Sequence, residues 1–82
     1  MYQIKIERKA QKKLAKISVP YYSNIKTAIL SLAENPRPTG CKKLKGREAY
    51  RIWVSNYRVI YEVVNDALLV LVIDVGHRRD IY

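Results

Sequence analysis

The chain ends in a short segment that concentrates groups able to handle protons and phosphates. Its last six residues contain the only histidine, two arginines and a terminal tyrosine, namely His77, Arg78, Arg79 and Tyr82. An imidazole transfers protons near neutral pH, and a guanidinium offers a planar set of donors that fits a phosphate. RNA carries its own nucleophile in the 2′-hydroxyl, so an enzyme that cleaves it must orient the phosphate, stabilise its charge and move protons. This set predicts RNA cleavage without metal or cofactor, although a single histidine is often incidental.

A second group with chemical potential lies in the middle of the chain. A two-residue turn at Ser55-Asn56 pairs Trp53 with Arg58 across two strands and puts Arg51 on the same face. Two guanidinium groups then flank an indole, which can stack on a base or hold an arginine by a cation–π contact. The alternative is an ordinary cross-strand pair on a solvated surface.

The charge balance points to a polyanionic partner. Sixteen Lys and Arg against seven Asp and Glu give a net charge of +9 on 82 residues. Such an excess costs self-repulsion in the folded state and favours nucleic acid first and an acidic protein second. The basic residues of the segment 8–16 are Arg8, Lys9, Lys12, Lys13 and Lys16, and those of the segment 42–47 are Lys42, Lys43, Lys45 and Arg47. Either segment is also consistent with a simple solvated face.

The elements that position these groups follow from the period of the apolar residues. The pattern predicts a strand over 2–6, helices over 8–17 and 18–35, a basic loop over 35–48, and strands over 50–54, 58–63 and 68–73. Ser18 and Pro20 form a helix-start signal, and Asn35-Pro36 ends the second helix because proline disfavours helical backbone in the preceding residue.

The resulting order β-α-α-β-β-β predicts one α+β domain spanning residues 1–82, with a mainly antiparallel sheet packed on a two-helix hairpin. The side chains expected to face the helices are Tyr50, Ile52, Val54, Val59, Tyr61 and Val63. The last strand is apolar on both sides, and its alternation puts Leu69, Leu71, Ile73 and Val75 on the opposite face from Leu68, Val70 and Val72. The helices can cover only one of these faces, which leaves one row of apolar side chains poorly buried. That row predicts a partner surface, unless the first strand or the C-terminal tail covers it.

Several classes of protein are excluded by composition. The longest apolar run is of strand length, so no membrane span is expected, and the absence of a signal-peptide pattern predicts a cytoplasmic protein. The lone cysteine, Cys41, cannot form an internal disulfide. One cysteine and one histidine are too few for a structural zinc site, so no metal is expected.

The second half of the chain resembles a known family. Its segments Lys43-Leu44-Lys45-Gly46, Tyr50-Arg51-Ile52, Tyr57-Arg58-Val59-Ile60-Tyr61 and Val75-Gly76-His77-Arg78-Arg79-Asp80-Ile81-Tyr82 are similar to the RelE/ParE superfamily of bacterial and archaeal toxins, on the RelE side. The resemblance implies the toxin of a type II toxin–antitoxin system, an mRNA interferase that cuts mRNA in the ribosomal A site after 2′-hydroxyl attack, without a metal. It also implies a RelB-like antitoxin as partner and allows a homodimer or a heterotetramer with that antitoxin.

The resemblance also assigns roles to individual residues. Arg58 corresponds to the family's arginine on the scissile phosphate, Arg78 to a second catalytic arginine, and Tyr82 lies near its C-terminal tyrosine. Arg51 and Trp53 stand where the best-known member has lysines, so Arg51 keeps a charge while Trp53 does not. His77 is expected to take over proton transfer from the lost lysine.

The remaining basic residues are expected to bind RNA or the ribosome. They are Lys9, Lys12, Lys13, Lys42, Lys43, Lys45, Arg47 and Arg79, together with the indole of Trp53. Two alternatives stay open: a ParE-like toxin that inhibits DNA gyrase through protein contact, and a non-toxic relative that only binds the antitoxin.

Overall fold

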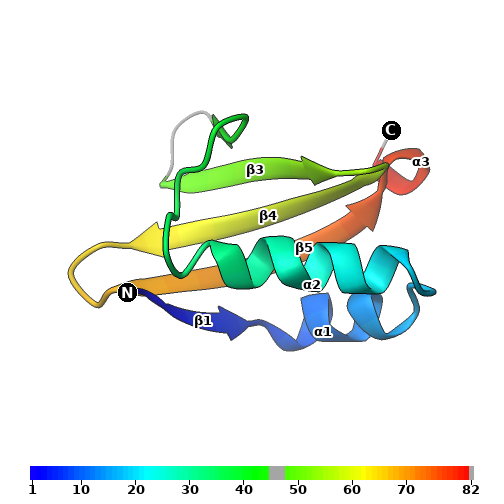
Figure 1. Cartoon of the computed structure of the whole chain (residues 1–82), viewed down its shortest axis with the longest axis horizontal. Helices are drawn as coiled ribbons and strands as arrows, with labels where there is room; N and C mark the ends of the chain where they lie inside the picture. The colour runs from blue at the N-terminus through cyan, green and yellow to red at the C-terminus, as the bar shows by residue number, and fades with distance from the viewer. Residues whose placement is uncertain (45–47, 82) are drawn as a thin grey trace.

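A five-stranded sheet carries two main helices and a terminal helical turn. The computed structural model describes residues 1–44 and 48–81. The elements in chain order are β1 (Gln3–Ile6), α1 (Arg8–Ala15), α2 (Tyr21–Ser31), β2 (Lys42–Lys43), β3 (Ala49–Val54), β4 (Tyr57–Val64), β5 (Leu69–His77) and α3 (Arg78–Ile81). Figure 1 shows α2 running across one face of the sheet, with α1 beside β1 and α3 at the end of β5.

The strand order is β1-β5-β4-β3-β2. β1 pairs with β5 in parallel, and the other three pairings are antiparallel. The predicted β-α-α-β-β-β order and mainly antiparallel sheet are thus confirmed. The sequence pattern did not predict β2 or α3, because two exposed lysines show no alternation and a four-residue helix shows no period.

The core lies between the helices and one face of the sheet. α1 contributes Ala10 and Leu14, and α2 contributes Ile25 and Ile29. The sheet contributes Tyr50, Ile52, Val59, Tyr61, Val63, Val70, Val72 and Val75. Val54 packs against this cluster while only partly buried. The predicted inward row of β3 and β4 is therefore confirmed.

The tight turn at Ser55-Asn56 sets the register that the sequence predicts. Val54 pairs with Tyr57, Trp53 with Arg58 and, further along, Ile52 with Val59. Ser55 has a positive φ of 55°, a conformation that tight hairpin turns use.

A bulge in β5 overturns one prediction. Tyr61 pairs with Val72 but Ile60 pairs with Asp74, so Ile73 is an extra residue on β5. An extra residue reverses the alternation beyond it. Val75 therefore points to the helices and is fully buried, and it does not belong to the outer row. Leu69, Leu71 and Ile73 are half-buried.

The helices are shorter than predicted. α2 starts after Pro20, and Ser18 contributes its carbonyl, which accepts the N–H of Tyr22, instead of a hydroxyl cap. α2 ends at Ser31, one turn before Asn35, because Leu32 and the residue after it bond to carbonyls three residues back. In the described part of the chain, no helix is long and apolar enough to cross a membrane.

Candidate active site

Arg58 is the second residue of β4, the central strand of the sheet, and lies on the face away from the helices. Its cross-strand neighbours are Trp53 on β3 and Gly76 on β5, which has no side chain. The arginine is half-buried. Its Nε is buried and has no hydrogen-bond partner within residues 1–44 and 48–81. A buried donor without an acceptor is costly in a folded protein, which singles out this guanidinium as a candidate functional group.

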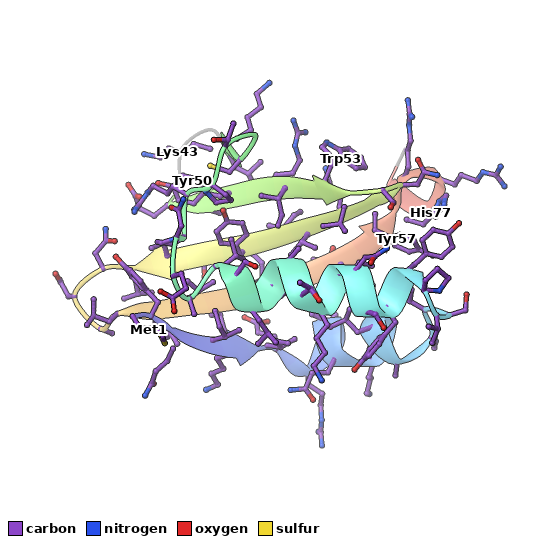
Figure 2. All side chains as sticks on the ribbon, viewed as in Figure 1. Met1, Lys43, Tyr50, Trp53, Tyr57 and His77 are labelled. Carbon is purple, nitrogen blue, oxygen red and sulfur yellow. The ribbon has the colours of Figure 1, made fainter. Side chains whose placement is uncertain are left out.

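His77 ends β5 on the opposite face from Arg58 and is fixed from two sides. Its Nδ1 accepts a hydrogen bond from the backbone N–H of Arg79 at 3.0 Å. Its ring meets the ring of Tyr57 edge to face, with 5.1 Å between the centroids. The Tyr57 ring in turn packs against the ring of Tyr21 on α2, with 5.8 Å between the centroids. Figure 2 shows Tyr57 and His77 side by side at one end of the sheet.

Arg51, Trp53 and Arg78 gather around the turn between β3 and β4. The guanidinium of Arg51 lies 5.9 Å from the centre of the Trp53 ring. The backbone N–H of Arg78 donates to the carbonyl of Asn56 at 2.7 Å, which ties α3 to the turn. Trp53, Ser55, Asn56 and Arg78 line a hollow of about 630 Å³. We call it the turn hollow.

A second hollow lies between α1 and the end of β5, with a volume of about 560 Å³. It is lined by Lys13, Lys16, Ile17, Tyr57, Arg58, Asp74, Val75, Gly76 and His77. We call it the helix hollow. Lys13 pairs with Asp74, with 2.8 Å between Nζ and Oδ1. The two hollows lie beside each other, because Trp53 lines one, Arg58 lines the other, and these two residues are direct cross-strand neighbours.

The predicted site residues therefore divide into those that the fold brings together and those that it does not. Near the β3–β4 turn, Arg58 and His77 line the helix hollow and Trp53 and Arg78 line the turn hollow, while Arg51 lies against the Trp53 ring. Tyr82 lies outside the described residues.

The basic residues predicted to bind RNA or the ribosome are spread more widely. Lys42 is opposite Arg51 in the β2–β3 pair, whereas Lys43 forms an ion pair with Glu48, with 3.2 Å between Nζ and Oε1. Figure 2 shows Lys43 away from the end that carries His77.

The α1 lysines divide in the same way. Lys9 lines a shallow depression over the outer face of the sheet, and Lys12 is exposed. Arg79 is exposed beside His77. Lys45 and Arg47 lie outside the described residues.

Three polar residues that line the helix hollow, Lys16, Tyr57 and Asp74, were not among the predicted site residues. Lys16 lies one helical turn from Lys13, a spacing that gives both the same helix face. Tyr57 directly precedes Arg58 in the sequence, but the alternation of side chains along β4 assigns Tyr57 to the face that packs on the helices. For Asp74 no sequence signal exists, because its position depends on the β5 bulge.

The chain matches the profile of a family described as the ParE toxin of the type II toxin–antitoxin system parDE, over residues 4–82. The chain belongs to the RelE/ParE toxin superfamily. Within this superfamily it is 30% identical, over 81 residues, to the mRNA interferase toxin RelE of Escherichia coli K12. The match covers 95% of this chain and 84% of that toxin.

Solved structures of RelE/ParE toxins share the fold. The intact E. coli RelBE toxin–antitoxin complex contains a chain that matches with a TM-score of 0.83 and 29% identity, covering 94% of this chain and 96% of that one. The RelE–RelB complex of Pyrococcus horikoshii matches with a TM-score of 0.82 over 94% of each chain at 23% identity, which supports the fold alone.

Proposed function

We propose that this protein is the toxin of a type II toxin–antitoxin system and an mRNA interferase that cuts mRNA in the ribosomal A site, thereby blocking translation. The observation that carries the proposal is the buried Nε of Arg58, which has no acceptor in residues 1–44 and 48–81. A phosphate oxygen is the acceptor that a guanidinium fits best. The similarity to the mRNA interferase toxin RelE supports the same reading.

The reaction needs no nucleophile from the protein. The RNA 2′-oxygen forms a bond to the adjacent phosphorus while the bond to the 5′-oxygen of the next nucleotide breaks. The proton of the 2′-hydroxyl passes to a base, and the leaving 5′-oxygen takes a proton from an acid. In this proposal Arg58 and Arg78 stabilise the charge on the phosphate, and His77 carries out one of the two proton transfers.

The other residues have supporting roles. Arg51 adds positive charge beside Trp53, whose ring takes a base of the RNA by stacking. Tyr82 takes the second proton transfer. The exposed lysines of α1 and β2, with Lys45, Arg47 and Arg79, bind the surrounding rRNA through their charge.

The proposed partner is a RelB-like antitoxin, since the E. coli RelBE toxin–antitoxin complex contains a chain similar to this one. A net charge of +9 suits an acidic segment that folds on binding. We propose a single domain over residues 1–82 that acts in the cytoplasm, where ribosomes translate.

The proposal is tested by mapping cleavage ends on mRNA during translation in a purified system. Wild-type protein should produce discrete cuts at the A site, Arg58→Ala should not, and Lys5→Ala should cut like wild type. Lys5 is the matched control because it is an exposed cation on β1, outside the proposed site.

A gyrase-directed toxin is the second candidate, because the matching family profile is named for ParE. Inhibition of gyrase supercoiling together with intact mRNA would favour it and contradict the proposed nuclease.

A further inference from the structure

We infer that the helix hollow is a second nucleotide subsite, in which Lys16 binds the phosphate next to the scissile one and Tyr57 contacts the attached nucleoside. The inference rests on the proposed function and extends it to the RNA on one side of the cut. It assigns a binding role to two residues that the predicted site left out.

The hollow exists because β1 is shorter than β5. β1 pairs only with Leu69–Val72, so within the described chain the second half of β5 has a strand neighbour on one side alone. α1 packs along the free side. The free backbone edge is partly satisfied by Asp74, whose Oδ1 accepts the N–H of Val75 at 3.0 Å. The hollow is the space that remains between α1 and this unpaired part of the β5 edge.

The charges in the hollow favour a polyanion. Lys13, Lys16 and Arg58 are cationic, and Asp74 is the one carboxylate among the lining residues. Asp74 is already paired with Lys13. Among the side chains that the structure describes, no carboxylate is paired with Lys16, which is exposed. The ammonium of Lys16 is therefore the cation free to bind an added phosphate.

The position of Arg58 connects this hollow to the cleavage site. Arg58 lines the helix hollow, while its cross-strand neighbour Trp53 lines the turn hollow. A phosphate bound at Arg58 thus lies between two spaces of about 560 and 630 Å³. Both volumes fall within the roughly 300–1,000 Å³ typical of small-ligand sites. An RNA strand whose scissile phosphate lies at Arg58 can place one neighbouring nucleotide in each.

Tyr57 supplies the wall for the nucleoside. Its ring contacts the rings of Tyr21 and His77, with centroid distances of 5.8 and 5.1 Å, so its position is supported before RNA arrives. Aromatic side chains next to cations are the usual surface for single-stranded nucleic acid, because every base has a face that can stack. The hollow thus offers both contacts that one nucleotide needs, a free ammonium and a fixed ring.

The test combines a protein change with a substrate change on ribosome-bound mRNA. Each of the two phosphates flanking the scissile one is replaced in turn by a neutral methylphosphonate, and single-turnover kcat/KM is measured for wild type, Lys16→Ala and the charge-matched control Lys5→Ala. We expect Lys16→Ala to lower kcat/KM roughly tenfold on normal mRNA, as for loss of a charge-assisted contact. Lys5→Ala should match wild type.

The neutral linkage decides the assignment. At one of the two positions the neutral linkage should lower the kcat/KM of wild type by about the same factor as the Lys16→Ala substitution does. At that position it should not lower the kcat/KM of the Lys16→Ala variant any further. The inference is overturned if Lys16→Ala and Lys5→Ala have the same kcat/KM. It is also overturned if the loss from Lys16→Ala and the loss from the neutral linkage multiply at both positions. A third contrary result is that Lys16→Ala weakens only the affinity for the antitoxin, which would make the hollow a protein contact. Absence of any cleavage by wild type would instead reject the proposed function, and the inference with it.

Discussion

The backbone N–H of Arg79 donates a hydrogen bond to Nδ1 of His77 over 3.0 Å. A nitrogen that accepts a hydrogen bond carries no proton, so the neutral imidazole has its proton on Nε2. Because the ring also meets Tyr57 edge to face at 5.1 Å, its orientation is set by the fold. Nε2 is therefore the atom through which His77 would exchange protons with RNA.

Two amide variants separate the structural and chemical roles of His77. Asparagine at position 77 places an oxygen near Nδ1 and can still accept the Arg79 N–H, but it has nothing at Nε2. We expect His77→Asn to keep the unfolding free energy of wild type and to lower the cleavage rate about 10²-fold, as for loss of a general acid or base.

His77→Gln should lose the same activity, because an amide cannot act as a general acid or base toward RNA. Cleavage within about threefold of wild type in either variant would remove His77 from the mechanism.

Arg58 should be a residue whose removal costs activity and not stability. Its Nε is buried without an acceptor in the described chain, so folding desolvates a donor without compensation. Arg58→Met keeps a flexible apolar stem and removes that donor. We expect cleavage to fall about 10²–10³-fold, while the unfolding free energy, measured by urea denaturation, stays equal or rises by up to about 1 kcal/mol. A loss of stability larger than that would mean that Arg58 is chiefly structural.

Exposed lysines should contribute unequally to ribosome binding. Lys12 is exposed on α1 with no ion pair among the described residues, whereas Lys43 is paired with Glu48. Each phosphate that a cation neutralises adds roughly 0.7–0.9 to the salt slope of log K. Lys12→Ala should therefore lower the slope by about that amount, and Lys43→Ala by less. Binding measured between low and physiological salt tests this ranking, and equal slopes for both variants would contradict it.

Tyr61 should stabilise the fold through its hydroxyl. The side chain is fully buried, and its hydroxyl donates to the carbonyl of Pro36 at 2.7 Å. Tyr61→Phe leaves that carbonyl without its donor and should lower the unfolding free energy by about 1–2 kcal/mol. Tyr22→Phe is the control, because the Tyr22 ring is partly buried and, in the described chain, its hydroxyl makes no hydrogen bond.

The same residue predicts a pH effect at alkaline pH. Burial raises the pKa of Tyr61 above its ordinary value of 10.0. Above pH about 10, the unfolded chain therefore loses a proton that the folded chain retains, and the stability of the fold falls as pH rises. By about pH 11 the advantage of wild type over Tyr61→Phe should shrink by about 1.4 kcal/mol. A constant difference between the two proteins across this range would contradict the buried neutral phenol.

Local patterns in the sequence were enough to predict the hairpin that carries the site. The alternation of β3 and β4 and the two-residue turn determine which residues face the helices, and they put Trp53 opposite Arg58. Both signals act between near neighbours in the chain, so no distant contact was needed to interpret them. The basic charge excess and the motif around Arg58 are likewise properties of the sequence alone.

The tertiary structure decided what the second half of β5 does. The bulge at Ile73 turns Val75 inward, and the shortness of β1 leaves the edge beside Asp74 free for α1 and its lysines. Strand alternation cannot reveal this bulge. β5 is apolar on both faces, so its sequence fits the sheet equally well with or without an extra residue. The pairing of β1 with β5 joins segments more than sixty residues apart. Lys16 therefore joins Tyr57 and Arg58 in one hollow only because the chain folds, since no spacing in the sequence brings α1 next to β4.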